Sequence, residues 1–231
     1  MNDAERLGRL AAGAAALVED GMALGLGSGS TAEAFMEALG RRIESGLRVT
    51  GVATSHRTEV KAIESGIILT TLMETPSLDL GVDGADEIDP NLDLVKGRGG
   101  ALLYEKIVAQ ACQRWVIVAA SEKLVDSLGS RIALPVEVIP FGWEQTAASV
   151  AALGLAPRLR TGPYGEPFRT DGGHYILDCQ TAGIEDPPAL ADALKLTTGV
   201  VEHGMFIEFA DVAMTVDEDG EITTHTRRSY E

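Results

Sequence analysis

The sequence predicts an α/β protein with a Rossmann-like, mostly parallel sheet and a second, smaller ferredoxin-like α+β domain. Over the first 120 residues short apolar strands alternate with segments of helical periodicity, a pattern typical of a parallel sheet covered on both faces. From Leu134 onward the order becomes strand, helix, strand, strand, helix, strand, which is the split βαβ plan. We therefore expect one domain from residues 1–130 and 208–231 and another from residues 131–207.

The elements of the first half follow from apolar spacing and from capping residues. The first helix is predicted from Leu7 onward, because apolar side chains recur at helical spacing, and Gly21 is expected to end it. A buried strand begins at Met22, and the next helix, over 32–39, has Ser30 or Thr31 as its expected N-cap. Further strands are predicted over 47–53, 66–71, 78–82 and 115–120, and further helices over 56–64 and 101–111, while 92–95 is a short apolar segment.

The second half contains the elements of the smaller domain and a final hairpin. A strand begins at Leu134, and a turn-rich stretch over 161–173 separates the two halves of the split plan. Helices are predicted over 144–153 and 188–196, and strands over 174–179 and 199–206. The last two strands, over 211–216 and 221–226, form a hairpin that we expect to return to the first sheet.

Composition excludes several classes of protein. The chain has 231 residues and a net charge of −16, with 35 acidic and 19 basic side chains, so neither a nucleic acid nor an anionic membrane is an expected partner. Its apolar stretches, such as 115–120, are far shorter than the roughly 20 residues that span a bilayer. The acidic N-terminal segment lacks the features of a signal peptide, and two cysteines give at most one bridge. These features predict a cytoplasmic protein.

A Gly/Ser-rich segment, GLGSGSTA, joins the first strand to the following helix. Glycines let the backbone approach an anion, and the N–H groups at a helix start favour negative charge, so a small phosphate is the expected ligand. A plain βα turn is the alternative. A dinucleotide fingerprint is excluded because the second strand ends without a carboxylate, and a nucleophile elbow is excluded because Leu26 and Ser30 flank Ser28 where glycines are needed.

An acidic segment, DLGVDGADEIDP, begins within the fourth predicted strand and continues into the turn after it. Asp83 and Asp86 lie around a Gly-Ala turn, where loop carboxylates usually face a site at the carboxyl end of a parallel sheet. Such carboxylates suit hydrogen bonds to sugar hydroxyls and proton transfer. Two alternatives stay open: a solvated turn in which Asp86 or Asp89 acts as a cap, and a Mg²⁺ site.

A third segment, KGRGGALLYEKIVAQAC, combines a cation, glycine N–H groups and a carboxylate. Lys96 lies beside three glycines, and Glu105 falls in the first turns of the next helix, where helix electrostatics favour an acid even without a function. Lys123 follows a buried strand and is expected at the same sheet end. Together the three segments predict a site for a phosphorylated, hydroxyl-rich small molecule that undergoes proton transfer.

Five motifs, in this order and at these separations, resemble ribose-5-phosphate isomerases of the A type: GLGSGSTA, DGADEID, KGRGGALLYEKIVA, SEKLV and LPVEVIPFGW. The resemblance runs from about Arg6 to the C-terminal hairpin. It implies interconversion of D-ribose 5-phosphate and D-ribulose 5-phosphate in the pentose phosphate pathway. It also implies that no metal or organic cofactor is needed and that the protein is a homodimer or homotetramer.

The resemblance assigns roles residue by residue. Glu105 matches the general base, and Lys123 matches a substrate contact. The remaining substrate-binding positions are Ser28, Gly29, Ser30 and Thr31, then Asp83, Gly84, Ala85 and Asp86, then Lys96, Gly97, Arg98 and Gly99. The sequence departs from the commonest family pattern at Ser28, Arg98, Tyr104 and His174.

These residues suggest an enediol mechanism with four catalytic side chains. Lys96 or Asp83 would help to open the furanose ring, and Glu105 would move the proton from C2 to C1. Lys96 and the N–H groups of 97–100 would stabilise the enediolate, while Asp86 would hold or relay protons at the hydroxyls. The alternatives are a coenzyme A transferase-like enzyme with a Glu nucleophile and a non-catalytic sugar-phosphate sensor.

Overall fold

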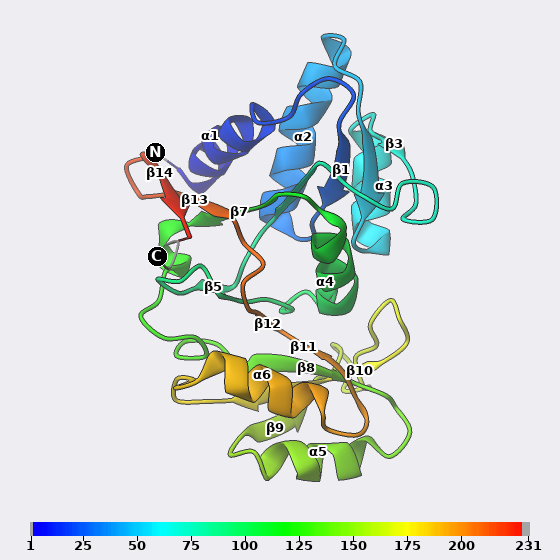
Figure 1. Cartoon of the computed structure of the whole chain (residues 1–231), viewed down its shortest axis with the longest axis vertical. Coiled ribbons are helices and arrows are strands. Elements are labelled where there is room, and N and C mark those ends of the chain that lie inside the picture. The colour runs from blue at the N-terminus through cyan, green and yellow to red at the C-terminus, as the bar shows by residue number, and fades with distance from the viewer. Residues whose placement is uncertain (1, 228–231) are drawn as a thin grey trace. The chain divides into compact units, whose positions relative to one another are not determined.

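The computed structural model describes residues 2–227, which form two compact units (Figure 1). Within these residues, unit 1 comprises the chain up to Ala85, Tyr104–Lys123 and the chain from Glu208; unit 2 comprises Asp86–Leu103 and Leu124–Ile207. The division therefore assigns 86–103 and 124–130 to unit 2, whereas the sequence-based boundaries, 1–130 with 208–231 and 131–207, place them in the larger part. Those boundaries stay a prediction about folding domains.

Unit 1 is built on a seven-stranded sheet whose strand order is β14-β13-β7-β4-β1-β2-β3. All neighbouring pairs are parallel except β13 with β14, so the predicted Rossmann-like sheet is confirmed, as is the return of the final hairpin to it. The strands are β1 (Ala23–Leu26), β2 (Thr50–Ala53), β3 (Ile68–Leu69), β4 (Leu80–Asp83), β7 (Trp115–Ala120), β13 (Val212–Val216) and β14 (Ile222–Thr226).

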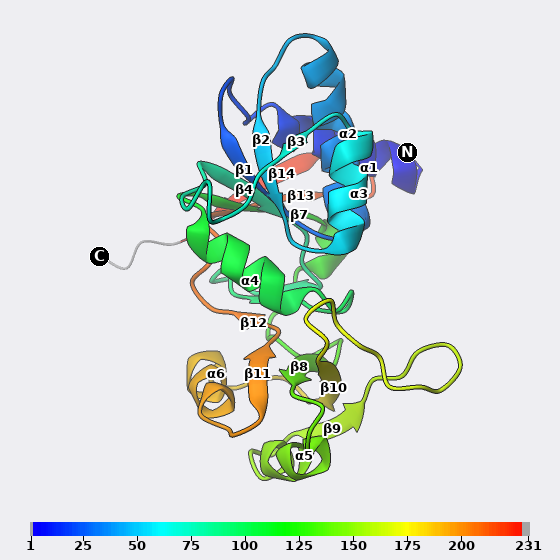
Figure 2. The same cartoon turned by 90° about the vertical axis from the view of Figure 1, so that its right-hand side faces the viewer.

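Helices cover both faces of this sheet. The helices α1 (Asp3–Ala15), α2 (Ser30–Glu44) and α3 (His56–Glu64) lie together beside the sheet (Figure 2). Their apolar side chains pack in one core with Leu24 and Leu26 of β1. Gly25, between those two leucines, faces the opposite side, toward α4 (Leu102–Ala111). A Cβ on Gly25 would lie 2.9 Å from Val108 Cγ1, so glycine is what lets this helix approach the sheet.

Unit 2 contains a four-stranded antiparallel sheet in the order β11-β8-β10-β9. With the helices α5 (Trp143–Ala151) and α6 (Pro187–Lys195), the strands β8 (Leu134–Val138), β9 (Ala156–Leu159), β10 (Tyr175–Gln180) and β11 (Val200–His203) confirm the ferredoxin-like plan. Val136 and Leu177 face the core that the two helices cover, so Glu137 and Asp178 point to the other face by strand alternation.

Unit 2 also contains a small three-stranded sheet that the sequence did not predict. It has the order β12-β6-β5, with antiparallel neighbours β5 (Glu87–Ile88), β6 (Leu94–Val95) and β12 (Met205–Phe206). The predicted strand 199–206 is in fact two strands, because Gly204 lies against another part of the backbone. A Cβ on Gly204 would be 2.2 Å from the carbonyl oxygen of Lys96, and the Lys96 N–H donates to the Gly204 carbonyl at 2.8 Å.

Several predicted element boundaries differ from the structure, and one strand was not predicted. The first helix ends at Ala15 rather than at Gly21, because the chain turns tightly there, with the Leu17 N–H donating to the Ala14 carbonyl. Gly29, not Ser30 or Thr31, caps α2. The strand β9 had not been located in the sequence. No helix within residues 2–227 has the length and apolar character needed to cross a membrane.

Candidate functional site

The strand order of unit 1 places three of the predicted segments at one edge of its sheet. The order reverses between β1 and β4, and ligands of such sheets bind outside the carboxyl ends of the strands at that point. Ser28 follows β1, Asp83 ends β4, and Lys123 lies in the 3₁₀ turn η1 (Ser121–Lys123) directly after β7. Because β1, β4 and β7 are neighbours, these residues lie at adjacent strand ends.

Asp83 connects the end of β4 to the start of the segment Ser28–Thr31, called the anion loop below. Its side chain is fully buried, and Oδ1 accepts hydrogen bonds from the N–H groups of Ser28, at 3.1 Å, and Gly84, at 2.8 Å. This contact depends on Gly27, where a Cβ would lie 2.2 Å from Asp83 Oδ1. The carboxylate therefore holds the anion loop in place as well as being a predicted catalytic group.

A network of hydroxyl groups lies behind the anion loop. Ser28 Oγ is 2.8 Å from Thr54 Oγ1 and 3.0 Å from both Ser55 Oγ and Thr58 Oγ1. Thr54 and Thr58 in turn donate to the carbonyl oxygens of Leu26 and Gly27. The network fixes the backbone of the loop through its side chains. Sequence reasoning missed these residues, although three hydroxyl side chains within 54–58, directly after the second strand, were a signal.

The start of α2 is open to an anion. Gly29 is the N-cap with φ 88°, a left-handed conformation that favours glycine, and no side chain caps the first turn. Gly29 and Ser30 are exposed, and Thr31 is half-buried. By contrast, Asn2 and Ser55 each accept a hydrogen bond from the first turn of their own helix. The N–H groups and the positive end of α2 therefore suit a phosphate group.

Glu105 and Lys106 are neighbours on α4 and both are buried, with 5% and 6% of their surface exposed. Two adjacent ionisable side chains rarely lie in the interior of a protein without a functional or pairing reason. Glu105 falls four positions into a helix that begins at Leu102, within its first turn, as the sequence predicted.

Most of the acidic segment has structural roles. Asp79 accepts the N–H of Ala23 at 2.8 Å, and Asp89 accepts two N–H groups of its own turn. Glu87, with 1% exposed, accepts the N–H groups of Gly129, Arg131 and Ile132. Among residues 2–227, no three His, Cys, Asp or Glu side chains are grouped to hold a metal ion, so the structure gives the Mg²⁺ alternative no support.

Unit 2 holds the segment Lys96–Gly99, called the KGRG loop below. Lys96 directly follows β6; its side chain is buried, and Nζ lies 5.5 Å from the centre of the Phe206 ring, a cation–π distance. Gly97 and Gly100 have φ values of 103° and 86°, so the turn requires glycine at both positions. Arg98 is exposed, which explains how a large side chain is accommodated here.

Two of the four N–H groups of 97–100 that are expected to stabilise the enediolate already have hydrogen-bond partners in the structure. The N–H of Arg98 donates to Asp86 Oδ2 at 3.1 Å, and the N–H of Gly100 donates to the Gly97 carbonyl at 3.0 Å. Both are engaged within unit 2, so the N–H groups of Gly97 and Gly99 are the candidates. The sequence left the roles of the two aspartates open, and each in fact organises a different loop: Asp83 the anion loop, and Asp86 the KGRG loop.

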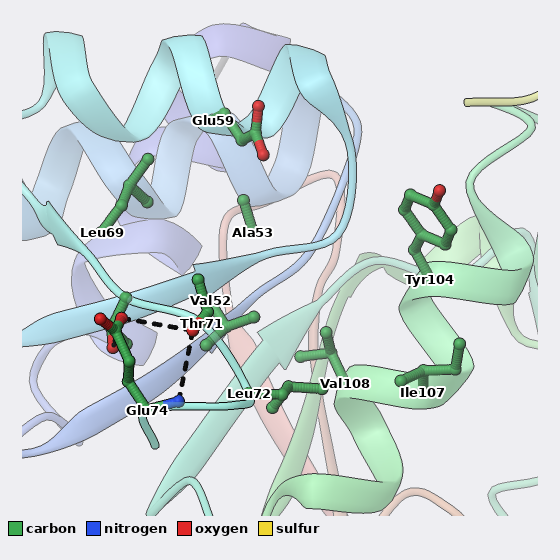
Figure 3. A pocket seen from close by; sticks show the side chains of 11 residues that line it. Val52, Ala53, Glu59, Leu69, Thr71, Leu72, Glu74, Tyr104, Ile107 and Val108 are labelled. Carbon is green, nitrogen blue, oxygen red and sulfur yellow. Dashed lines mark hydrogen bonds between the residues drawn. The ribbon is translucent and has the colours of Figure 1, made fainter. Parts of the chain in front are cut away.

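The hollow in Figure 3 is a separate feature of unit 1. It encloses about 470 Å³ between β2, the segment after β3 and α4, and apolar side chains such as Leu72 and Ile107 line it. Glu59 and Glu74 supply its ionisable groups, and Tyr104 lines its α4 side. Among residues 2–227, no lysine or arginine and none of the predicted site residues lines this hollow, so it does not suit a phosphate.

The fold and the grouped residues define an α/β protein with a glycine- and serine-rich loop, and a helix start without a side-chain cap, at the switch point of a Rossmann-ordered sheet. The chain belongs to the ribose 5-phosphate isomerase A family, also described as phosphoriboisomerase A, whose sequence profile matches residues 50–220. It is 49% identical to ribose-5-phosphate isomerase A of Thermomicrobium roseum over 92% of this chain and 90% of that protein. It is 50% identical to ribose-5-phosphate isomerase A of Rhodopseudomonas palustris HaA2, over 95% of this chain and 97% of that protein.

Solved structures agree with this assignment. A D-ribose-5-phosphate isomerase in complex with phospho-erythronic acid superposes with a TM-score of 0.94, at 35% identity, over 98% of this chain and 100% of that one. Ribose 5-phosphate isomerase from Plasmodium falciparum superposes with a TM-score of 0.93, at 37% identity, over 98% of this chain and 99% of that one. The likeness extends over both units, which confirms the fold class predicted from the sequence.

Proposed function

We propose that this chain interconverts D-ribose 5-phosphate and D-ribulose 5-phosphate through an enediolate, in the non-oxidative branch of the pentose phosphate pathway. The observation that carries the proposal is its similarity to relatives named ribose-5-phosphate isomerase A, which are about 50% identical over 92–95% of the chain. The coenzyme A transferase-like and sensor alternatives have no support in these comparisons.

The phosphate of the substrate binds at the anion loop. The N–H groups that begin α2 are not capped by a side chain, and the hydroxyls of Ser30 and Thr31 add donors beside them. Lys123, at the end of the neighbouring β7, supplies a positive charge. A related isomerase was solved in complex with phospho-erythronic acid, which is itself a phosphorylated, hydroxyl-bearing anion.

Glu105 is the base that moves the proton. It takes the proton from C2 and returns it to C1, which requires its carboxylate to reach both carbons. Its burial in α4 excludes bulk water from the carboxylate and so limits loss of the proton to solvent. Lys96 or Asp83 moves the protons of ring opening, before the C2 proton becomes acidic.

The negative charge that develops on the enediolate oxygen is stabilised by the KGRG loop. The buried ammonium group of Lys96 and the N–H groups of Gly97 and Gly99 are the donors. Gly84, Ala85 and Asp86 contact the sugar hydroxyls, and Asp86 also holds the Arg98 N–H. None of these steps calls for a metal or an organic cofactor. We also propose that the protein is cytoplasmic, forms a homodimer or homotetramer, and binds neither nucleic acid nor membranes.

A conversion assay tests this function. Purified protein is incubated with ribose 5-phosphate in the presence of EDTA, and ribulose 5-phosphate is followed by NMR; we expect conversion to equilibrium in both directions. Absence of conversion would overturn the proposal. Formation of a hydroxylamine-trapped acyl enzyme with an acyl-coenzyme A donor would instead favour the transferase-like alternative.

A further inference from the structure

A guanidinium group of unit 2 holds two carbonyl groups of the KGRG loop. Arg160 Nη1 donates to the carbonyl oxygens of both Gly97 and Arg98, each at 3.0 Å. Arg160 follows β9 and its side chain is 14% exposed, so the contact is largely shielded from solvent. It joins positions 63 and 62 residues apart in the chain, and neither the sequence motifs nor the proposed mechanism uses Arg160.

Holding these two carbonyls sets the direction of two N–H groups. In a trans peptide the C=O and N–H of one unit point to opposite sides. The Gly97 carbonyl shares its peptide unit with the Arg98 N–H, which donates to Asp86 Oδ2 at 3.1 Å. The Arg98 carbonyl shares its unit with the Gly99 N–H, so this donor also points away from Arg160. A cation on a carbonyl oxygen also polarises the peptide unit and makes its N–H a stronger donor.

Arg160 is itself held in a fixed orientation. Asp178 of β10 accepts from Nε at 2.9 Å and from Nη2 at 2.5 Å, a bidentate pair that leaves Nη1 for the loop. The Phe168 ring lies 5.6 Å from the guanidinium carbon. The same ring closes over Gly100, where a Cβ would lie 2.6 Å from two of its carbons. The hairpin that carries Arg160 and Phe168 thus contacts the middle of the KGRG loop and Gly100, the residue directly after it.

We propose that Arg160, oriented by Asp178, is a positioning residue that aims the Gly99 N–H at the enediolate oxygen. This role rests on the proposed function. Arg160 acts through the peptide units and does not touch the substrate, so it affects the charged intermediate more than ground-state binding at the anion loop. Loss of Arg160 should therefore lower kcat while leaving KM nearly unchanged.

The test compares Arg160→Met and Arg160→Lys with Arg158→Met. Arg158 is an exposed arginine on β9, two residues before Arg160, so its replacement removes the same charge without touching the loop. One well-placed oxyanion donor contributes about 10²–10³ in kcat, so we expect Arg160→Met to lower kcat at least about tenfold, with KM within about threefold. Arg160→Lys should also lower kcat, because an ammonium group cannot hold Asp178 and both carbonyls together. Arg158→Met should match the wild type.

An amide measurement reads the positioning independently of activity. In ¹⁵N-labelled protein, the Gly99 amide resonance should shift and its hydrogen exchange should accelerate in both Arg160 variants but not in Arg158→Met. If Arg160→Met does not fold, kcat and the Gly99 amide are measured in Arg160→Lys and Asp178→Asn, and these two variants test the proposal. Unchanged kcat and an unchanged Gly99 amide in these variants, or an equal loss in Arg158→Met, would overturn the proposal. An inactive wild type would overturn the proposed function itself, and that result is seen before any variant is made.

Discussion

Gly27→Ala tests how closely the anion loop depends on Asp83. Its Cβ would lie 2.2 Å from Oδ1, 2.3 Å from Cγ and 2.6 Å from the Cα of Asp83. Rotation of the Asp83 side chain relieves only the first two contacts, because the Cα belongs to the backbone of β4. Overpacking of this kind costs about 1–3 kcal/mol, and partial loss of the two N–H bonds to the carboxylate brings the expected destabilisation to about 2–4 kcal/mol.

The assay is thermal unfolding followed by circular dichroism, with Gly8→Ala as the matched control. In a chain of this size 1 kcal/mol corresponds to roughly 2–4 °C, so Tm should fall on the order of 10 °C in Gly27→Ala. Gly8 lies in α1 with open space around its Cβ position, so Gly8→Ala should raise the free energy of unfolding by about 0.5–1 kcal/mol. A Gly27→Ala protein with wild-type Tm and wild-type kcat/KM would refute the assigned role of Asp83 in holding the loop.

Three further predictions concern ionisable side chains. Glu105→Gln should lower kcat at least about 10²-fold with little change in Tm. The control Glu74→Gln, at the rim of the hollow in Figure 3, should leave kcat unchanged. A folded Glu105→Gln protein with more than about a tenth of wild-type kcat would contradict the role of Glu105 as base. Burial raises the pKa of Glu137, so ionisation of this carboxyl destabilises the folded protein as the pH rises above the usual range for Glu. In urea unfolding, the free energy of unfolding of Glu137→Gln relative to the wild type should therefore increase from about pH 4.5 to about pH 7.5. A difference between the two proteins that is equal at both pH values would be inconsistent with this cause. Burial raises the pKa of the Cys112 and Cys179 thiols to about 12. At about pH 8 both should therefore react slowly with Ellman's reagent in the native protein and rapidly in denaturant. A fast reaction in the native protein would show that burial does not protect these thiols.

Elements with complete local signals were predictable from the sequence. The helix His56–Glu64 was predicted to the residue, because Ser55 is a good N-cap and accepts the Thr58 N–H at 3.1 Å. The strand Trp115–Ala120 was predicted to the residue because it is a continuous apolar run in the middle of a parallel sheet. In both, propensity and tertiary context favour the same structure.

The start of α2 shows where a local rule fails at a functional loop. Ser30 and Thr31 are better N-caps by propensity than Gly29, but the turn needs φ 88° and so favours glycine. A helix start without a side-chain cap keeps its N–H groups for a ligand. The departure from the usual cap is therefore consistent with the phosphate site that we propose at this loop.

Long-range pairs in the candidate site could not be predicted from one sequence. Arg160 and Gly97 are 63 residues apart, and nothing in the local sequence of either indicates the other. The same holds for Glu87, which belongs to the acidic segment and accepts hydrogen bonds from N–H groups more than 40 residues away. A motif shows which residues are chemically suited to a site, whereas the tertiary fold decides which of them are used to hold a loop.

Isomerisation by proton transfer is tested most directly by following ribose 5-phosphate in D₂O by NMR with EDTA present. The burial of Glu105 slows exchange of the abstracted proton with solvent but does not prevent it, so ribulose 5-phosphate should form and, after many turnovers, a measurable share of it should carry deuterium at C1. The Glu105→Gln protein, treated identically, should form little product. Absence of ribulose 5-phosphate, or product with only protium at C1, would contradict an isomerase that works by proton transfer.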